Sequence, residues 1–220
     1  ALGECYLILG TVLVGDPPAA RRAQAAAAAR AALALDDGLA SAHALLAVVD
    51  TREWRWAAAE EGYRRAMDLA PNDAAIRADY ALYLAALGRS DEALAEARLA
   101  ESLDPLSLHQ RTSAGMVLQL ARRQDEAIRQ FQRVLAIDPK FLFARWLLGI
   151  SYTIKGMQAE AIECFAAAEQ VSSSPSSVAW RAYALARAGR RDEAHRILEA
   201  LLARAAHEYV PAPMIAFVYL

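Results

Sequence analysis

The stretch Leu142–Pro175 reads LFARWLLGISYTIKGMQAEAIECFAAAEQVSSSP, and it sets the pattern for the whole chain. A turn at Lys155-Gly156 separates two apolar segments, 142–155 and 158–170. Their apolar residues recur at the three- and four-residue spacing of an amphipathic helix; they are Leu148, Gly149 and Tyr152, then Ala161, Phe165 and Ala168. The stretch therefore predicts two helices joined by a short turn.

The same arrangement returns along the chain at intervals of 34 residues, with one interval of 33. Counted from the start of each repeat, positions 8, 20 and 27 are small, position 24 is often aromatic and position 32 is often proline. Self-similarity at a fixed period is the signature of a repeat architecture. The repeats are approximately 1–39, 40–73, 74–107, 108–141, 142–174 and 175–208, with part of a seventh at 209–220.

This pattern resembles the tetratricopeptide repeat over essentially the whole chain. The resemblance implies an all-α fold: a single domain over 1–220 that forms a right-handed superhelix, or α-solenoid, of antiparallel helix pairs. Alanine, the best helix former, makes up about a quarter of the residues, which also favours an all-α fold. Each helix pair cannot bury its apolar face alone, so stacking of neighbouring pairs closes one continuous core.

Some segments also resemble the C-terminal repeat modules of bacterial multidomain signalling proteins. Those proteins are winged-helix transcription regulators, Ser/Thr kinases, adenylate cyclases and TolB-like proteins, and the segments are 53–60, 83–89, 103–107 and 209–211. This resemblance implies a module of a larger protein, in the cytoplasm, or in the periplasm if that protein spans a membrane. The chain begins without methionine inside one repeat and ends inside another, so we expect a segment of a longer protein.

Charge and apolar content limit the classes of partner. Lys plus Arg number 24 and Asp plus Glu 26, which lacks the basic excess of a nucleic-acid surface. The longest apolar run near the start, Tyr6–Val14, is far shorter than the roughly 20 residues of a membrane span. Cys5 and Cys164 lie far apart in the repeat pattern and are expected to be free thiols. We therefore expect a protein or peptide partner, no direct nucleic-acid contact and no membrane insertion.

No motif for catalysis or metal binding occurs in the sequence. The four histidines do not form an HExxH pattern, and CxxC, GxGxxG, GxxxxGK[ST] and GxSxG are all absent. Acidic pairs such as Asp91-Glu92 open predicted helices, where they suit the helix dipole. Arginine pairs such as Arg64-Arg65 have acidic neighbours, which favours ion-paired helix surfaces. From the sequence we expect that the chain is not an enzyme and that it has no catalytic residue, metal site or cofactor.

A second apolar stripe on the first helix of the fifth repeat predicts a binding groove. Phe143, Trp146 and Ile150 occupy positions 2, 5 and 9, which by resemblance line the concave face. The corresponding candidates in other repeats are Leu82, His109, Met116, Gln119 and Tyr183. Exposed apolar patches mark contact sites, and aromatic residues dominate binding hot spots. We expect the groove to bind an apolar helix or extended peptide; the alternative is that Phe143 and Trp146 pack between repeats.

Three local features have two interpretations each. Trp54 and Trp56 are expected to pack into a helix-pair junction, with a ligand role for Trp54 as the alternative. Arg77, Arg111 and Arg145 recur every 34 residues; we prefer a structural ladder over a strip for an acidic ligand. The run 172–177 is the longest polar patch and is expected to be a flexible joint.

Two rival functions remain beside the interaction module. The array could be a homo-oligomer that self-associates through its open ends or through 209–220. It could instead be the regulatory segment of a kinase or cyclase whose catalytic domain lies outside this chain.

Overall fold

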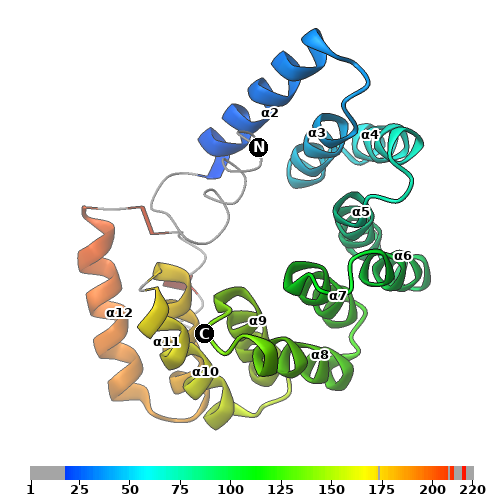
Figure 1. The fold of residues 1–220 in the computed structure, drawn as a ribbon. Coiled ribbons are helices and arrows are strands. Elements are labelled where there is room, and N and C mark those ends of the chain that lie inside the picture. Colours follow the sequence, from blue (N-terminus) through cyan, green and yellow to red (C-terminus); the bar gives the residue numbers. More distant parts are fainter. Residues whose placement is uncertain (1–17, 173, 208, 211–214, 217–220) are drawn as a thin grey trace. The chain divides into compact units, whose positions relative to one another are not determined.

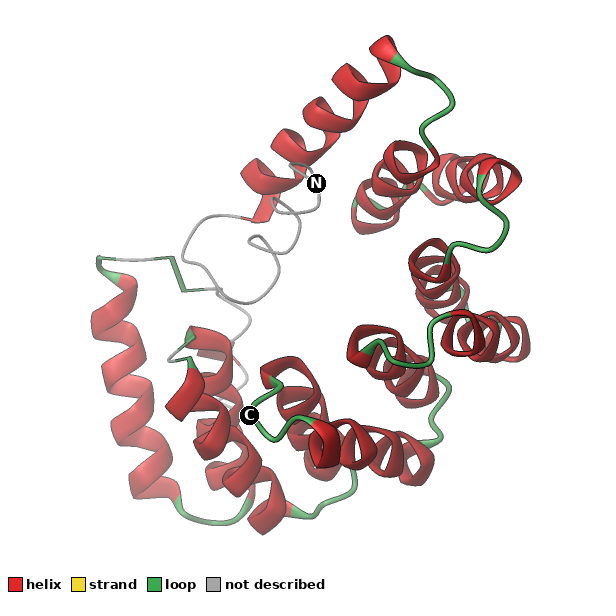
Figure 2. Ribbon diagram, viewed as in Figure 1, coloured by secondary structure: helices red, strands yellow, loops and turns green. Residues whose placement is uncertain are grey.

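The structure is a computed structural model, and it describes residues 18–172, 174–207, 209–210 and 215–216. Over these residues the regular structure is α-helical, which confirms the predicted fold class (Figure 2). The eleven helices are α2 (Pro18–Leu35), α3 (Ala40–Arg52), α4 (Trp56–Leu69), α5 (Ala74–Ala86), α6 (Ser90–Leu103), α7 (Leu108–Leu120), α8 (Gln124–Ile137), α9 (Leu142–Ile154), α10 (Gln158–Val171), α11 (Pro175–Arg187) and α12 (Arg191–Ala205).

The helices form two compact units, the first with α2 to α7 and the second with α8 to α12. In the first unit, α3 pairs with α4 and α5 pairs with α6, while α3, α5 and α7 also contact one another in order (Figure 1). In the second unit, α9 pairs with α10 and α11 with α12, and α9 contacts α11. Each unit is thus a stack of antiparallel helix pairs. The single domain and its right-handed superhelix stay predictions.

Alanine at position 20 brings the two helices of each pair together. The residue is Ala59, Ala93, Ala127, Ala161 or Ala194, and none is more than 3% exposed. A side chain of one methyl group lets the second helix approach closely, so larger residues pack around it. The predicted core residues Leu148, Gly149 and Tyr152 of α9 are likewise buried.

The turn between the two helices of a pair uses the same backbone conformation in every described repeat. Position 15 has a positive φ: 77° at Gly88, 78° at Gly156, 80° at Gly189, but also 60° at Trp54 and 61° at Arg122. Glycine is favoured there because a side chain strains this left-handed conformation. Trp54 is 77% exposed, so the prediction that it packs into the helix junction is wrong. Trp56 is half-buried and packs against Tyr83, as expected.

The periodic arginines bind the proline turn that precedes their own helix. Each guanidinium donates to a proline carbonyl six residues earlier; the pairs are Arg77 with Pro71, Arg111 with Pro105 and Arg145 with Pro139. Arg77 also forms an ion pair with Glu96 of α6, at 2.7 Å between nitrogen and oxygen. These contacts favour the structural interpretation of the ladder.

Short polar side chains begin several of the first helices. Asp73 accepts hydrogen bonds from the backbone N–H groups of Ala75 and Ile76, and Ser107 caps α7 in the same way. Ser174 caps α11 and is itself buried, as are Ser176 and Ser177. Residues 174–177 of the serine-rich run are therefore the start of a helix, Ser173 lies outside the described residues, and the flexible joint stays a prediction.

Candidate functional site

The eight predicted groove residues lie on the first helices of their repeats, four in each unit. Leu82 is on α5, and His109, Met116 and Gln119 are on α7 of the first unit; Phe143, Trp146 and Ile150 are on α9, and Tyr183 is on α11 of the second. His109 is exposed and the other seven are half-buried. They form one candidate surface in each unit.

Position 9 gives both surfaces their apolar character. In the first unit it is Leu82 and Met116, preceded by Val48 of α3; in the second unit it is Ile150 and Tyr183. Every one of these residues is half-buried, so each helix presents one apolar side chain of the same row. Val48 was missed by the sequence reasoning, although its place in the repeat marks it. We call these five residues the position-9 row.

Positions 5 and 12 are more enclosed than the sequence predicts. The position-5 residues Ala44, Ala78, Thr112 and Ala179 are all buried, and at position 12 so are Ala85 and Thr153. Helices α3, α5 and α7 contact their neighbours in the first unit, as do α9 and α11 in the second. We attribute the burial of positions 5 and 12 to this packing. Ala78, Ala85, Thr112, Thr153 and Ala179 therefore offer no exposed side chain to a ligand.

Trp146 combines features of the groove and of the packing between repeats. Its ring is stacked on that of Phe143, with centroids 6.4 Å apart and planes inclined by 15°. Its indole Nε1 is buried and has no hydrogen-bond acceptor among the described residues. The nitrogen edge of the ring thus faces inward, while the residue as a whole stays half-exposed. This geometry supports packing for the nitrogen edge of the ring, and the residue keeps some exposed surface for contact.

The second unit also holds an aromatic pair on α11. Trp180 and Tyr183 meet edge to face with centroids 5.9 Å apart, and Trp180 stacks on the buried ring of Phe165 at 6.0 Å. The chain of rings fixes Tyr183 of the position-9 row against the core. A rigid aromatic side chain loses little conformational entropy when it binds, which suits a contact site.

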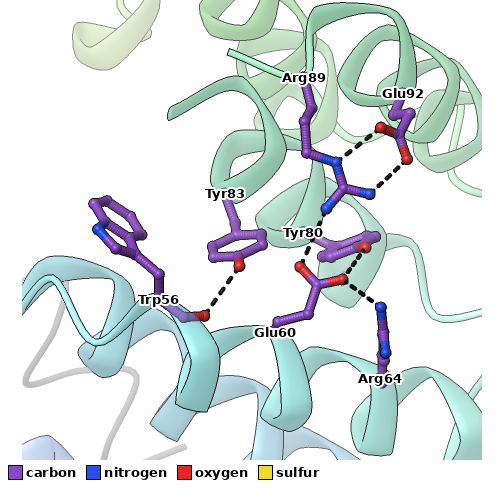
Figure 3. A network of polar contacts seen from close by, with 7 residues as sticks. All are labelled: Trp56, Glu60, Arg64, Tyr80, Tyr83, Arg89 and Glu92. Carbon is purple, nitrogen blue, oxygen red and sulfur yellow. Dashed lines mark hydrogen bonds and ion pairs between the residues drawn. The ribbon is translucent and has the colours of Figure 1, made fainter. Parts of the chain in front are cut away.

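A polar network in the first unit joins α4 to the next repeat (Figure 3). Glu60 Oε1 accepts from the hydroxyl of Tyr80 at 3.0 Å and pairs with Arg64 at 3.1 Å, and its Oε2 pairs with Arg89 at 3.3 Å. Tyr83 donates to the carbonyl oxygen of Trp56 at 3.0 Å. Burial of Tyr83 raises its pKa to about 12, and the Glu60 carboxylate acts in the same direction.

The titratable groups do not assemble into a reactive centre in the described part of the chain. Burial raises the pKa of the Cys164 thiol to about 11, so it is protonated at neutral pH and is a poor nucleophile. His195 lies 3.4 Å from Glu199 on an exposed helix face, and a ring nitrogen of His43 lies 2.9 Å from the Asp37 carbonyl oxygen. Across the described residues no three His, Cys, Asp or Glu side chains are placed to hold a metal ion. Cys5 lies outside the described residues.

Comparison with known proteins finds solved structures of similar fold but no protein of closely similar sequence. No family model and no curated protein matches the sequence. PilW, a type IV pilus biogenesis factor, is 19% identical over 99% of this chain and 98% of its own, with a TM-score of 0.73. Pseudomonas aeruginosa PilF is 22% identical over 94% and 93%, with a TM-score of 0.62.

Human IFIT1, solved as a dimer with PPP-AAAA, is 18% identical over 83% of this chain and 45% of its own, with a TM-score of 0.72. At such identities the likeness shows the fold alone, a helical repeat of the tetratricopeptide type. None of the described helices is both long and apolar enough to cross a membrane.

Proposed function

We propose that this chain is a non-catalytic protein-interaction module that binds an apolar helix or extended peptide on the position-9 residues of each unit. Proteins with this fold generally bind other proteins, and the fold supplies parallel first helices on which such a row can form. The observation that carries the proposal is the character of position 9 in each unit: Val48, Leu82 and Met116 in the first and Ile150 and Tyr183 in the second are apolar or aromatic, and all are only half-buried. We propose that the module is part of a larger bacterial signalling or transcription-regulatory protein, and that it lies in the cytoplasm, or in the periplasm if that protein spans a membrane.

An apolar protein segment fits this row better than a charged ligand. An amphipathic helix laid in a groove is recognised through apolar side chains on one of its faces. Human IFIT1 is solved with PPP-AAAA, and binding of phosphate groups requires positive charge along the ligand. The position-9 row has no arginine or lysine, so we propose a protein partner for it.

The test compares the parent chain and two variants by the proteins that each one captures from a bacterial lysate. Trp146→Ala with Ile150→Ala removes the candidate contact in the second unit. Ile154→Ala is the matched control, because Ile154 lies on the same helix and is 57% exposed. A protein retained by the parent chain and by the control, but lost by the folded double variant, supports the groove.

The captured partner is then purified and titrated against Leu82→Ala and Met116→Ala, which test the row in the first unit. Truncation of a contact side chain is expected to weaken binding by about fivefold or more. Equal binding by all folded variants would overturn the proposal. The rival of self-association predicts a different result, a mass that rises with concentration without any partner.

A further inference from the structure

Exposed apolar side chains stand in a row at one edge of the first unit. Trp54 is 77% exposed, Leu87 38% and Leu120 51%. They lie at or just beyond the C-terminal ends of α3, α5 and α7. These three helices run in the same direction and contact one another in order, so their ends share one edge. We call this the turn edge; it is separate from the position-9 row, which lies along the helices.

Two residues of the turn edge occupy a backbone conformation that favours glycine. Trp54 and Arg122 have φ values of 60° and 61°, where the corresponding residues of three other repeats are Gly88, Gly156 and Gly189. A left-handed conformation costs about 1–2 kcal/mol for residues other than glycine. Trp54 is exposed as well as strained, so neither packing nor backbone preference explains a tryptophan there. Such strain is found preferentially at functional positions.

Two arginines at the turn edge have no ion-pair partner among the described residues and are available to a ligand. Arg55 pairs with Asp50 and Glu53, and Arg89 pairs with Glu92. Arg52 and Arg122 are exposed and form no ion pair within the described part of the chain. Arg52 is two residues from Trp54 in the sequence, and Arg122 is two residues from Leu120. The turn edge thus carries two uncompensated positive charges near its apolar residues.

The mixed charge of this edge selects between a protein and a lipid surface. Attraction to an anionic membrane requires a cluster of about four to eight basic residues. Here Glu53, Asp91 and Glu92 lie at the same edge, so its charge alternates in sign. A membrane of uniform negative charge would meet these carboxylates, whereas a folded or folding peptide can place its own charges to suit.

We propose that the turn edge binds an acidic amphipathic segment of a partner protein. Apolar side chains of that segment pack on Trp54, Leu87 and Leu120, and its carboxylates pair with Arg52 and Arg122. The indole of Trp54 meets the ring of Trp56 edge to face, with centroids 5.4 Å apart. That contact holds the exposed ring in place as an anchor. The proposal does not depend on the position-9 row, so either surface can fail its test alone.

The test selects peptides from a random library displayed on phage, using the whole chain as target. Peptides that bind the parent are then measured against Trp54→Gly and Arg122→Gly. Both variants relieve the left-handed strain, so each should fold at least as well as the parent, and loss of binding cannot be attributed to unfolding. Leu106→Gly is the matched control for loss of an exposed apolar residue, because Leu106 is 88% exposed in the turn between α6 and α7.

We expect a class of selected peptides rich in Asp, Glu and aliphatic residues, with affinity about tenfold lower for Trp54→Gly. Arg122→Gly should lower the affinity of the same peptides about threefold, with the difference vanishing at high salt. Leu106→Gly should bind as the parent does. Selection of no peptide that depends on Trp54, or of basic peptides, would overturn the proposal. Stronger binding to phosphatidylserine vesicles than to the selected peptides would overturn it in favour of a membrane.

Discussion

The backbone of Gly149 in α9 lies directly against the ring of Phe165 in α10. A Cβ on Gly149 would stand 2.7 Å from Cε1 of that ring and 2.8 Å from Cζ, closer than carbon atoms can pack. Phe165 is itself fully buried and stacks on Trp180, so its ring has little room to move. Glycine at this point of the fifth repeat is therefore fixed by the size of its partner.

Gly149→Ala should destabilise the protein although alanine is the better helix former. Overpacking of a core costs about 1–3 kcal/mol, and the gain in helix propensity of about 1 kcal/mol offsets only part of it. We expect a net loss of up to about 2 kcal/mol in urea unfolding. The double variant Gly149→Ala with Phe165→Leu should lose less stability than the sum of the losses of the two single variants. A strictly additive double variant would contradict the contact.

Arg122→Gly should stabilise the protein, because glycine relieves the left-handed conformation at the turn. The relief of about 1–2 kcal/mol exceeds the added freedom of the unfolded chain, about 0.4–1 kcal/mol, so a gain of about 0.5–1 kcal/mol is expected. Gly88→Ala is the reverse control: nothing lies within 4 Å of the added Cβ, so its loss of stability reports the backbone alone. Thermal unfolding that ranks Arg122→Gly below the parent would show that the arginine side chain stabilises the turn by more than the strain.

The repeat pattern predicts the fold because small residues at fixed positions determine how closely helices approach. Ala59, Ala93 and Ala161 are buried as their positions require. The burial of most position-5 residues could not be predicted, because resemblance to a family gives the face of a helix and not how closely the next helix covers it. Trp54 was misassigned for a related reason: its place in the repeat predicts the conformation of its backbone, and that conformation directs the side chain into solvent.

The arginine ladder shows what the sequence pattern leaves open. The 34-residue interval of Arg77, Arg111 and Arg145 is visible in the sequence, but their acceptors are backbone carbonyl groups. Every residue has a backbone carbonyl group, so the sequence does not show which carbonyl group accepts from an arginine. Sequence reasoning can name only acidic side chains as acceptors. The proline at position 32 marks the turn, and the structure shows that its carbonyl oxygen is the acceptor.

Arg111→Lys should destabilise the turn between α6 and α7. Nε and one terminal nitrogen of Arg111 donate to the Pro105 carbonyl oxygen at 3.0 and 2.7 Å, and a lysine ammonium cannot reproduce this two-pronged contact. We expect a loss of about 1 kcal/mol, with faster amide hydrogen exchange in the turn. Arg98→Lys, at an exposed position of α6, is the control and should leave both measurements unchanged. Equal effects of the two changes would show that the contact of Arg111 with the Pro105 carbonyl oxygen does not stabilise this turn.

Glu60→Gln should make stability less dependent on pH in the acid range. Burial of Glu60 alone would raise its pKa, but the nearby hydroxyls of Tyr83 and Tyr80 and the charges of Arg89 and Arg64 outweigh burial, so the pKa is lowered. Of the two hydroxyls, that of Tyr80 donates to Glu60, and that of Tyr83 donates to the carbonyl oxygen of Trp56. Because the pKa is lower in the folded state, the carboxylate stabilises the protein above the ordinary glutamate pKa, about 4.3. That contribution is lost as the pH falls through the lowered value, where the folded protein also takes up the proton.

The measurement is urea unfolding of the parent and of Glu60→Gln between pH 7 and pH 3. At pH 7 the variant should be less stable by about 1–2 kcal/mol, since charged hydrogen bonds are replaced by neutral ones. The difference should narrow as the pH falls below the ordinary glutamate pKa, because the parent then takes up the proton and loses the contribution of the charge. Glu92→Gln is the matched control: its side chain is 58% exposed and pairs only with Arg89 among the described residues, so its effect at pH 7 should be smaller. A constant gap between the parent and Glu60→Gln across the whole range would show that the network acts through shape and not through the charge of Glu60.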